Sequence, residues 1–182
     1  MAARNPDPTR LDVAALAAEG ASLIGQWPAA QLERWHALQA PPPGVALEPV
    51  NWQIRGELRR VAGEPAQVWL HLRAEATAWP ICQRCLQPLH EALVVERALR
   101  FVESEARAEA LDAQSEDDVL ALAPSLDLRT LVEDELLLAW PIVPRHAQCS
   151  APAHRAGEAG AQSSAGPFEA LIALKRPHQP ER

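Results

Sequence analysis

Three cysteines and one histidine have the spacing of metal ligands. Two residues separate Cys82 from Cys85, and His146 and Cys149 repeat this spacing far along the chain. Thiolate sulfur and imidazole nitrogen are the ligands that zinc takes in structural sites with four protein ligands. Two turns that converge in space can bring such distant pairs together. Cys82, Cys85, His146 and Cys149 are therefore candidate ligands of a zinc ion, as an alternative to a protein without a cofactor.

Two other interpretations of the cysteines stay open. An odd number of cysteines does not make a disulfide framework, and free cysteines are often small buried residues with no chemical role. A redox-active pair at Cys82 and Cys85 needs the N-terminus of a helix that follows a strand, and Pro80 and Pro88 oppose that context. Metal content and thiol titration would separate these alternatives.

Arginine accounts for sixteen of the seventeen basic residues, and many of these arginines fall in the region expected to form strands. Arg55 and Arg59 flank one expected strand, and Arg84 lies between the two close cysteines. The forked guanidinium suits phosphate oxygens, so these three side chains are candidate RNA-binding residues. An ordinary charged outer face of a sheet explains them equally well.

The formal net charge of −7 argues against a protein that coats nucleic acid or anionic membranes by bulk attraction. The acid is concentrated in residues 101–139, which hold eleven acidic and two basic residues. Residues 103–124 show no trustworthy apolar period, and we predict a mobile acidic loop there. Residues 103–118 could then bind a basic protein. We read Glu133, Asp134 and Glu135 as the solvated side of a helix.

The sequence lacks the usual catalytic templates. It contains no glycine-rich phosphate loop, no G-x-S-x-G elbow and no H-E-x-x-H motif. No run approaches the roughly 20 apolar residues of a membrane helix, and the first residues do not form a signal peptide. We therefore expect a soluble, cytoplasmic protein that is not an enzyme, with no membrane partner and no small-molecule substrate.

The expected elements place the cysteine pair between two strands. Residues 11–39 predict two short helical pieces, and alternating apolar residues in 52–59 and 68–73 predict a hairpin. A third strand is expected from Glu91 to Val102. A helix over 127–139 should begin at Asp127 as N-cap and end before Pro141. The fold class is α+β: a single domain whose antiparallel sheet is packed by helices, with mobile acidic and C-terminal linker segments.

The C-terminal region predicts a linker and a last helix. Residues 150–166 are poor in apolar side chains, and Pro167 can begin a short helix that runs to residue 176. Phe168, Leu171 and Leu174 would form an apolar stripe on that helix, with Lys175 beside it. A helix this short is marginal alone, so its stripe must dock either on this domain or on a partner, and we favour the partner.

Three segments together resemble the bacterial YceD-like family, the large ribosomal RNA subunit accumulation proteins. They are CQRCLQPL at 82–89, DLRTLVEDELLLAWPIVPRHAQC at 127–149 and PFEALIALK at 167–175, and the segment at 11–38 is similar to the opening of that family. The resemblance implies a YceD-like α+β domain over residues 1–149. A flexible linker (150–166) and a C-terminal amphipathic helix (167–176) follow from the composition.

The resemblance also implies a function that composition does not reveal. Proteins of this family are non-enzymatic factors needed for accumulation of 23S ribosomal RNA. We therefore expect this chain to bind large-subunit RNA, or a ribosomal or assembly protein. The candidate contact residues are Arg55, Arg59, Arg84, Phe168, Leu171, Leu174 and Lys175. The alternative is a zinc-binding or thiol redox protein that uses Cys82 and Cys85.

Overall fold

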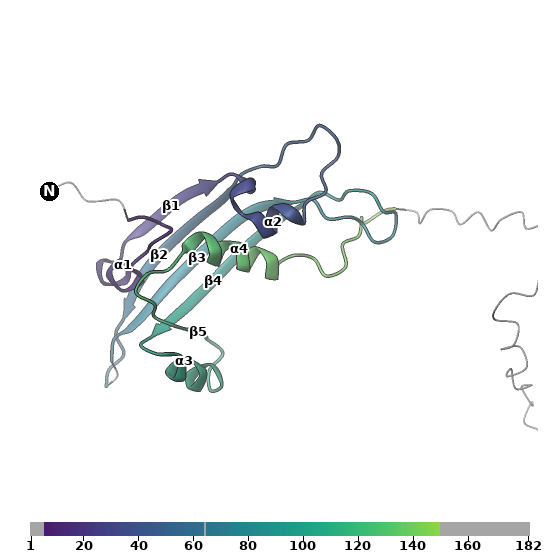
Figure 1. Ribbon diagram of the computed structural model, residues 1–182. Helices are drawn as coiled ribbons and strands as arrows, with labels where there is room; N and C mark the ends of the chain where they lie inside the picture. The colour runs from purple at the N-terminus through teal and green to yellow at the C-terminus, as the bar shows by residue number, and fades with distance from the viewer. Residues whose placement is uncertain (1–5, 64, 150–182) are drawn as a thin grey trace, which may run out of the picture. The chain divides into compact units, whose positions relative to one another are not determined.

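The computed structural model of this protein describes residues 6–63 and 65–149, and these form one five-stranded sheet with four helices (Figure 1). The strands follow the chain order across the sheet, and every neighbouring pair is antiparallel except β4 and β5, which are parallel. The predicted α+β class and the antiparallel sheet are therefore confirmed. The strands are β1 (Ser22–Trp27), β2 (Val50–Arg59), β3 (Gln67–Ala78), β4 (Glu91–Val102) and β5 (Asp118–Ala121). The helices are α1 (Val13–Glu19), α2 (Glu33–Ala37), α3 (Glu105–Asp112) and α4 (Leu128–Leu138), with a 3-10 turn at Ala29–Gln31.

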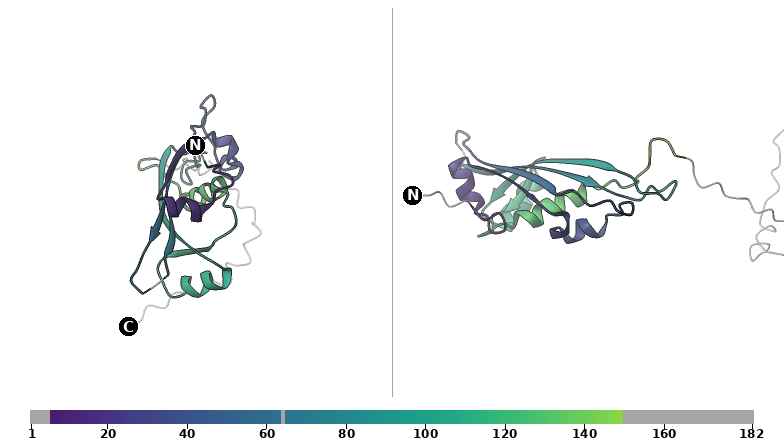
Figure 2. Two further views of the ribbon diagram at one scale, coloured as in Figure 1. Left: turned by 90° about the vertical axis from the view of Figure 1, so that its left-hand side faces the viewer. Right: turned by 90° about the horizontal axis from the view of Figure 1, so that it is seen from above.

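The sheet has a helix-covered face and an open face. Because side chains alternate along a strand, Ile54, Leu70 and Leu72 point to one face and are buried there. Helices α1, α2 and α4 lie on that face, as Figure 2 shows from above. Leu128, Val132 and Leu136 of α4 complete the core and are fully buried. The opposite face, formed mainly by β2, β3 and β4, carries polar side chains.

The predicted hairpin, third strand and long helix are confirmed. Strands β2 and β3 pair in antiparallel register, and β4 has the predicted bounds. Helix α4 begins directly after Asp127, whose Oδ1 accepts hydrogen bonds from the backbone N–H groups of Arg129 and Thr130 at 2.9 and 3.3 Å. A carboxylate in this position satisfies helix N–H groups that have no partner inside the helix.

The helical interpretation of residues 11–39 is correct only at its two ends. The middle forms the edge strand β1, which pairs with β2 from Ser22 to Trp27. Gly25 is essential to this arrangement, because the indole ring of Trp52 occupies the space that a Cβ would need. The rings of Trp27 and Trp52 stack with centroids 4.7 Å apart. Pairing and aromatic packing, which no local pattern encodes, therefore decided this segment.

The prediction of a mobile acidic loop over 103–124 is wrong. This segment contains helix α3, whose N-cap Ser104 accepts a hydrogen bond from the Arg107 N–H, and strand β5. Ala108 and Val119 are buried, and β5 pairs in parallel with the last residues of β4. Backbone pairing of β5 with β4 and burial of Ala108 and Val119 stabilise this segment despite its many acidic residues, whose side chains lie mostly toward solvent.

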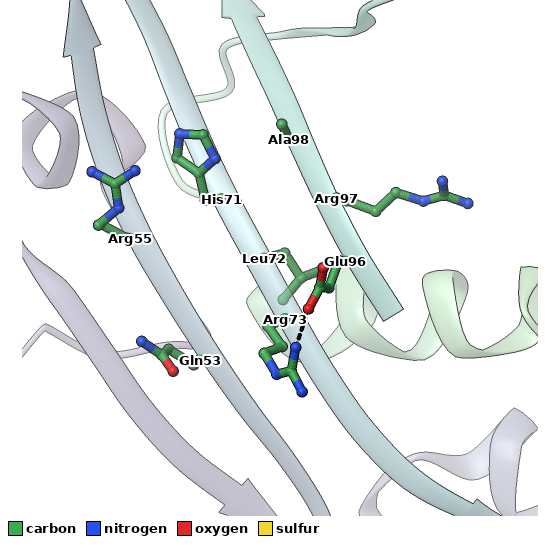
Figure 3. A pocket seen from close by; sticks show the side chains of 8 residues that line it. All are labelled: Gln53, Arg55, His71, Leu72, Arg73, Glu96, Arg97 and Ala98. Atoms are coloured by element: carbon green, nitrogen blue, oxygen red, sulfur yellow. Dashed lines mark hydrogen bonds and ion pairs between the residues drawn. The ribbon is translucent and has the colours of Figure 1, made fainter. Parts of the chain in front are cut away.

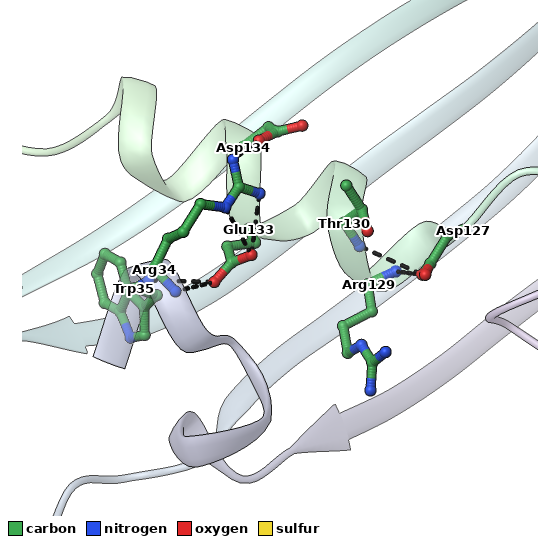
Figure 4. A network of polar contacts seen from close by, with 7 residues as sticks. All are labelled: Arg34, Trp35, Asp127, Arg129, Thr130, Glu133 and Asp134. Carbon is green, nitrogen blue, oxygen red and sulfur yellow. Dashed lines mark hydrogen bonds and ion pairs between the residues drawn. The ribbon is translucent and has the colours of Figure 1, made fainter. Parts of the chain in front are cut away.

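The acidic run on α4 is not the solvated face that the sequence suggested. Glu133 and Glu135 are each only 8% exposed. The Glu133 carboxylate accepts hydrogen bonds from the side chain and the backbone N–H of Arg34 (Figure 4), and Glu135 accepts one from Arg97 Nε at 2.8 Å. Paired and hydrogen-bonded carboxylates can be buried where unpaired ones cannot.

The predictions for the C-terminal region lie outside the described residues. They concern the linker 150–166, the helix 167–176 and the contact residues Phe168, Leu171, Leu174 and Lys175. Within the described part of the chain, no helix combines the length and the apolar character that crossing a membrane requires.

Candidate metal centre

The cysteine pair lies in a closed loop between β3 and β4. Its two arms are joined by an antiparallel bridge between Ile81 and Pro88. The Cys82 N–H donates to the Gln87 carbonyl at 2.9 Å, and the Leu89 N–H donates to the Pro80 carbonyl at 2.8 Å. These bonds hold the loop as a tight turn, which we call the knuckle and define as residues 80–89.

The tip of the knuckle has an uncommon backbone conformation. Leu86 has a φ of 59°, in the left-handed region that side-chain-bearing residues rarely adopt, and its N–H donates to the Cys82 carbonyl at 2.9 Å. A strained residue persists where the surrounding structure holds it, and such residues gather at functional sites. Here the left-handed residue and its bond to Cys82 close the turn that carries both cysteines.

The segment after α4 returns to the knuckle. The Gln83 N–H donates to the Pro144 carbonyl at 2.9 Å, and Arg84 Nη1 donates to the Cys149 carbonyl at 3.0 Å. In Figure 1 the yellow-green end of the described chain meets the teal loop beyond β3 and β4. This return brings His146 and Cys149 beside the cysteine pair.

The four predicted ligands converge at one point. Their ligand atoms all lie within 4.8 Å of one another, with Cys82 Sγ 3.7 Å from Cys149 Sγ and Cys85 Sγ 3.4 Å from His146 Nδ1. A tetrahedral zinc ion with ordinary bond lengths places two sulfurs about 3.8 Å apart and a sulfur and a nitrogen about 3.6 Å apart. The side chains therefore have the separations of a zinc site.

A hydrogen bond outside the cluster orients the histidine. His146 Nε2 lies 3.1 Å from the Pro88 carbonyl oxygen. Because a carbonyl can only accept, Nε2 carries the proton, and Nδ1 presents its lone pair to the cysteines. Metal-bound histidines usually donate their other ring N–H to such a group, which fixes both the tautomer and the ring orientation.

The surroundings favour a thiolate at Cys82. Burial opposes ionisation of this thiol, but backbone N–H donors of Cys85, His146 and Arg84 favour the charged form, and together they lower its pKa to about 5. Burial raises the pKa of Cys149, and the sulfurs of Cys82 and Cys85 raise it further. Three sulfurs packed together repel as anions, and a divalent cation between them removes that repulsion.

The chemistry of this donor set fits a structural zinc site. Three thiolates and one imidazole make four ligands, so a bound zinc ion would keep no open position for substrate. The knuckle does not begin a helix among the described residues around Cys82 and Cys85, so the helix N-terminus that is typical of redox cysteine pairs is missing, and backbone N–H donors of the turn lower the pKa of Cys82 instead. The geometry therefore favours metal binding over thiol redox chemistry.

The predicted arginines do not form one surface. Arg55 and Arg59 lie on the open face of the sheet, whereas Arg84 lies in the knuckle beyond the far end of β3. Arg55 and Arg59 both contact the carboxylate of Glu57, at 3.6 and 3.3 Å, and Arg59 also lies over the ring of Trp69 at 4.3 Å. Two of the three are therefore already paired within the sheet.

A shallow pocket of about 430 Å³ lies on this open face, between β2, β3 and β4 (Figure 3). Arg73 contacts Glu96 inside it and Glu75 beside it. His71 Nε2 lies 2.6 Å from Glu57. The charged side chains of the pocket are thus already paired, Arg97 with Glu135 of α4 and the others with neighbours on the open face, so it is a weak binding site for phosphate.

Sequence reasoning missed the groups that support the candidate ligands. The carbonyls of Pro88 and Pro144 orient the histidine and the returning chain, and backbone groups carry no signal in the side-chain pattern. It also missed Arg145, which is exposed beside His146. A signal for Arg145 was present, because 136–149 contains this arginine and no acidic residue.

Comparison with known proteins adds the family. No solved structure matches this chain. The family described as Large ribosomal RNA subunit accumulation protein YceD matches residues 70–175, which include most of β3, the knuckle, β4, α3, β5, α4 and the returning segment with all four candidate ligands. The match covers more than half of the 182 residues. The chain therefore belongs to the YceD family of large ribosomal RNA subunit accumulation proteins.

Proposed function

We propose that this protein supports the accumulation of large-subunit ribosomal RNA by binding, without covalent chemistry, to that RNA or to a protein that assembles with it. The family match over residues 70–175 carries the proposal, because the name of the family states the role in large ribosomal RNA accumulation.

In this proposal one zinc ion stabilises the binding module. Cys82, Cys85, His146 and Cys149 supply its ligands, and the His146 ring is held by the Pro88 carbonyl. The ion would join the knuckle to the segment that follows α4, two parts of the chain that otherwise meet through few hydrogen bonds. Such a link makes metal binding part of the folding free energy.

The function is tested in the cell that makes the protein. Depletion of the chain is expected to lower the ratio of 23S to 16S ribosomal RNA, and re-expression of the wild type is expected to restore it. The Cys85→Ser variant removes one ligand and should restore the ratio poorly. Gln83→Ala, in the same turn, leaves the ligands intact and serves as the matched control. An unchanged ratio after depletion contradicts the proposed function.

A further inference from the structure

We propose that the knuckle and the returning segment form a surface that binds single-stranded RNA. This inference deepens the proposed function and rests on it, since it chooses RNA as the partner and assigns the contact surface. We call this surface the knuckle end, and it consists of Ile81, Arg84, Leu86, Ile142, Val143 and Arg145.

The knuckle end is one continuous surface, although it comes from two distant parts of the sequence. The bond from the Gln83 N–H to the Pro144 carbonyl places Val143 and Arg145 beside the knuckle. The bond from Arg84 to the Cys149 carbonyl holds the other end of the returning segment. The four candidate metal ligands, which come from the same two segments, have their ligand atoms within 4.8 Å of one another.

Large apolar side chains are exposed on the knuckle end. Ile142 is 92% exposed, Leu86 65%, Val143 48% and Ile81 40%. Single exposed apolar residues are ordinary, but four in two adjoining loops make a patch of the kind that marks an interaction site. The strained backbone at Leu86 holds one of these side chains outward, at the tip of the turn.

The charge of the knuckle end is basic, against the sign of the whole protein. Residues 76–90 and 136–149 contain Arg84 and Arg145 and no acidic residue, while the chain carries a net charge of −7. Neither arginine forms a salt bridge with any of the residues that the structure describes. The arginines of the open sheet face, in contrast, contact Glu57, Glu75 or Glu96. Phosphate can therefore bind at the knuckle end without displacing a carboxylate.

The opposite end of the sheet is acidic. Residues 103–118 follow β4 and hold seven acidic residues and one arginine. Strand β4 has twelve residues, so about 40 Å separates its beginning at the knuckle from its end at this acidic segment. A polyanion is repelled by the acidic end and attracted to the knuckle end, which orients the protein on its partner.

Exposed apolar side chains beside guanidinium groups fit unpaired RNA better than a duplex. The faces of unstacked bases pack against apolar side chains and arginine planes, and arginines also contact the phosphates. In a double helix the base faces are covered by stacking, so Ile142 and Leu86 would find no partner there. A purely apolar protein partner would leave Arg84 and Arg145 without a counterion.

Fluorescence anisotropy with the full chain and a labelled single-stranded oligoribonucleotide of mixed sequence tests the inference. The double variant Arg84→Gln with Arg145→Gln is expected to bind at least tenfold more weakly. Its slope of log affinity against log salt should fall by about 1.4, since each phosphate contact on a single strand contributes about 0.7. The control Arg55→Gln with Arg59→Gln should bind like the wild type. Arg145→Gln alone should lower the slope by about 0.7 and leaves the bond of Arg84 to Cys149 intact.

A second pair of variants tests the apolar contribution. Ile142→Ser with Val143→Ser should weaken binding about fivefold to tenfold with no change in the salt slope, because no ionic contact is lost. A duplex of the same sequence should bind more weakly than the single strand. Equal binding of single strand and duplex, or equal effects of the knuckle and sheet variants, would overturn the inference.

Failure of this inference can be told apart from failure of the proposed function. If the wild type restores the 23S to 16S ratio in depleted cells but does not bind the oligoribonucleotide, the proposed function stands and the RNA surface is refuted. If depletion leaves that ratio unchanged, the proposed function itself is refuted. Capture of a large-subunit protein by the wild type but not by the knuckle variants, without binding of the oligoribonucleotide, would also overturn the RNA assignment.

Discussion

Glu133 on α4 caps the N-terminus of α2, although Glu133 and Arg34 are 99 residues apart in the sequence. Its Oε1 accepts hydrogen bonds from the backbone N–H groups of Arg34 and Trp35 at 2.7 and 3.1 Å. Its Oε2 accepts two more from the Arg34 guanidinium, at 2.9 and 3.0 Å (Figure 4). One carboxylate thus accepts hydrogen bonds from two helix N–H groups and forms an ion pair with Arg34. Together these bonds hold α2 against α4.

The Glu133 cap predicts unequal effects for the two partners. Glu133→Ala removes every one of these bonds and leaves buried N–H groups unsatisfied, so it should lower the free energy of unfolding by about 2–3 kcal/mol. Arg34→Ala removes a side chain that is 52% exposed and leaves the two backbone N–H bonds to Glu133, so it should cost clearly less than Glu133→Ala. Urea unfolding measures both, and equal effects would contradict the capping role.

A zinc site predicts about one equivalent of metal in the purified protein. If free zinc stands a thousandfold above Kd, the bound ion adds about 4 kcal/mol to the free energy of unfolding. A chelator should therefore lower the Tm of the wild type, and Cys85→Ser should abolish that response. Gln83→Ala should behave as the wild type. Mass spectrometry of the metal and thermal melts test this, and metal-free protein with an unchanged Tm would refute the site.

Glu57 predicts a specific dependence of stability on pH. Hydrogen bonds from Arg59 and His71 lower the pKa of its carboxyl below the ordinary 4.5. A native pKa below the unfolded value adds stability above pH 4.5, and this contribution is lost as the pH falls through the lower native value. The wild type should therefore exceed Glu57→Gln by a small constant amount from about pH 5 to 7. That difference should vanish in stronger acid, as urea unfolding at a series of pH values can show. A difference that grows on acidification has the opposite sign and would exclude this role.

Gly56 of β2 lies so close to α1 that we predict no larger residue fits at this position without moving the helix. A Cβ at this position would lie 2.6 Å from backbone atoms of Leu16 and Ala17. Backbone atoms cannot rotate away as a side chain would, so Gly56→Ala must displace α1 and should cost about 1–3 kcal/mol. Gln53→Ala, on the same strand with an exposed side chain, is the control. Stability equal to the wild type in urea unfolding would mean that α1 moves at little cost.

The sequence by itself determined the elements whose signals are local. Alternation over 52–59 and 68–73 specified the hairpin, and the run from Glu91 to Val102 specified β4. Asp127 and the apolar stripe specified α4, because an N-cap and a helical period act within one turn of chain. The set of four candidate ligands was also readable, since ligand type and short spacing are local properties.

The tertiary structure alone decided what depends on distant partners. Strands β1 and β5 exist because they pair with β2 and β4. Glycine is needed at position 25 because the Trp52 ring occupies the space that a Cβ would fill. Burial of Glu133 depends on the N–H groups at the start of α2 together with the Arg34 side chain, and orientation of His146 depends on the Pro88 carbonyl. Arg55 and Arg84 look alike in the sequence, yet one faces a carboxylate and the other does not. The free energies of pairing, burial and charge neutralisation come from neighbours in space, so no local pattern can contain them.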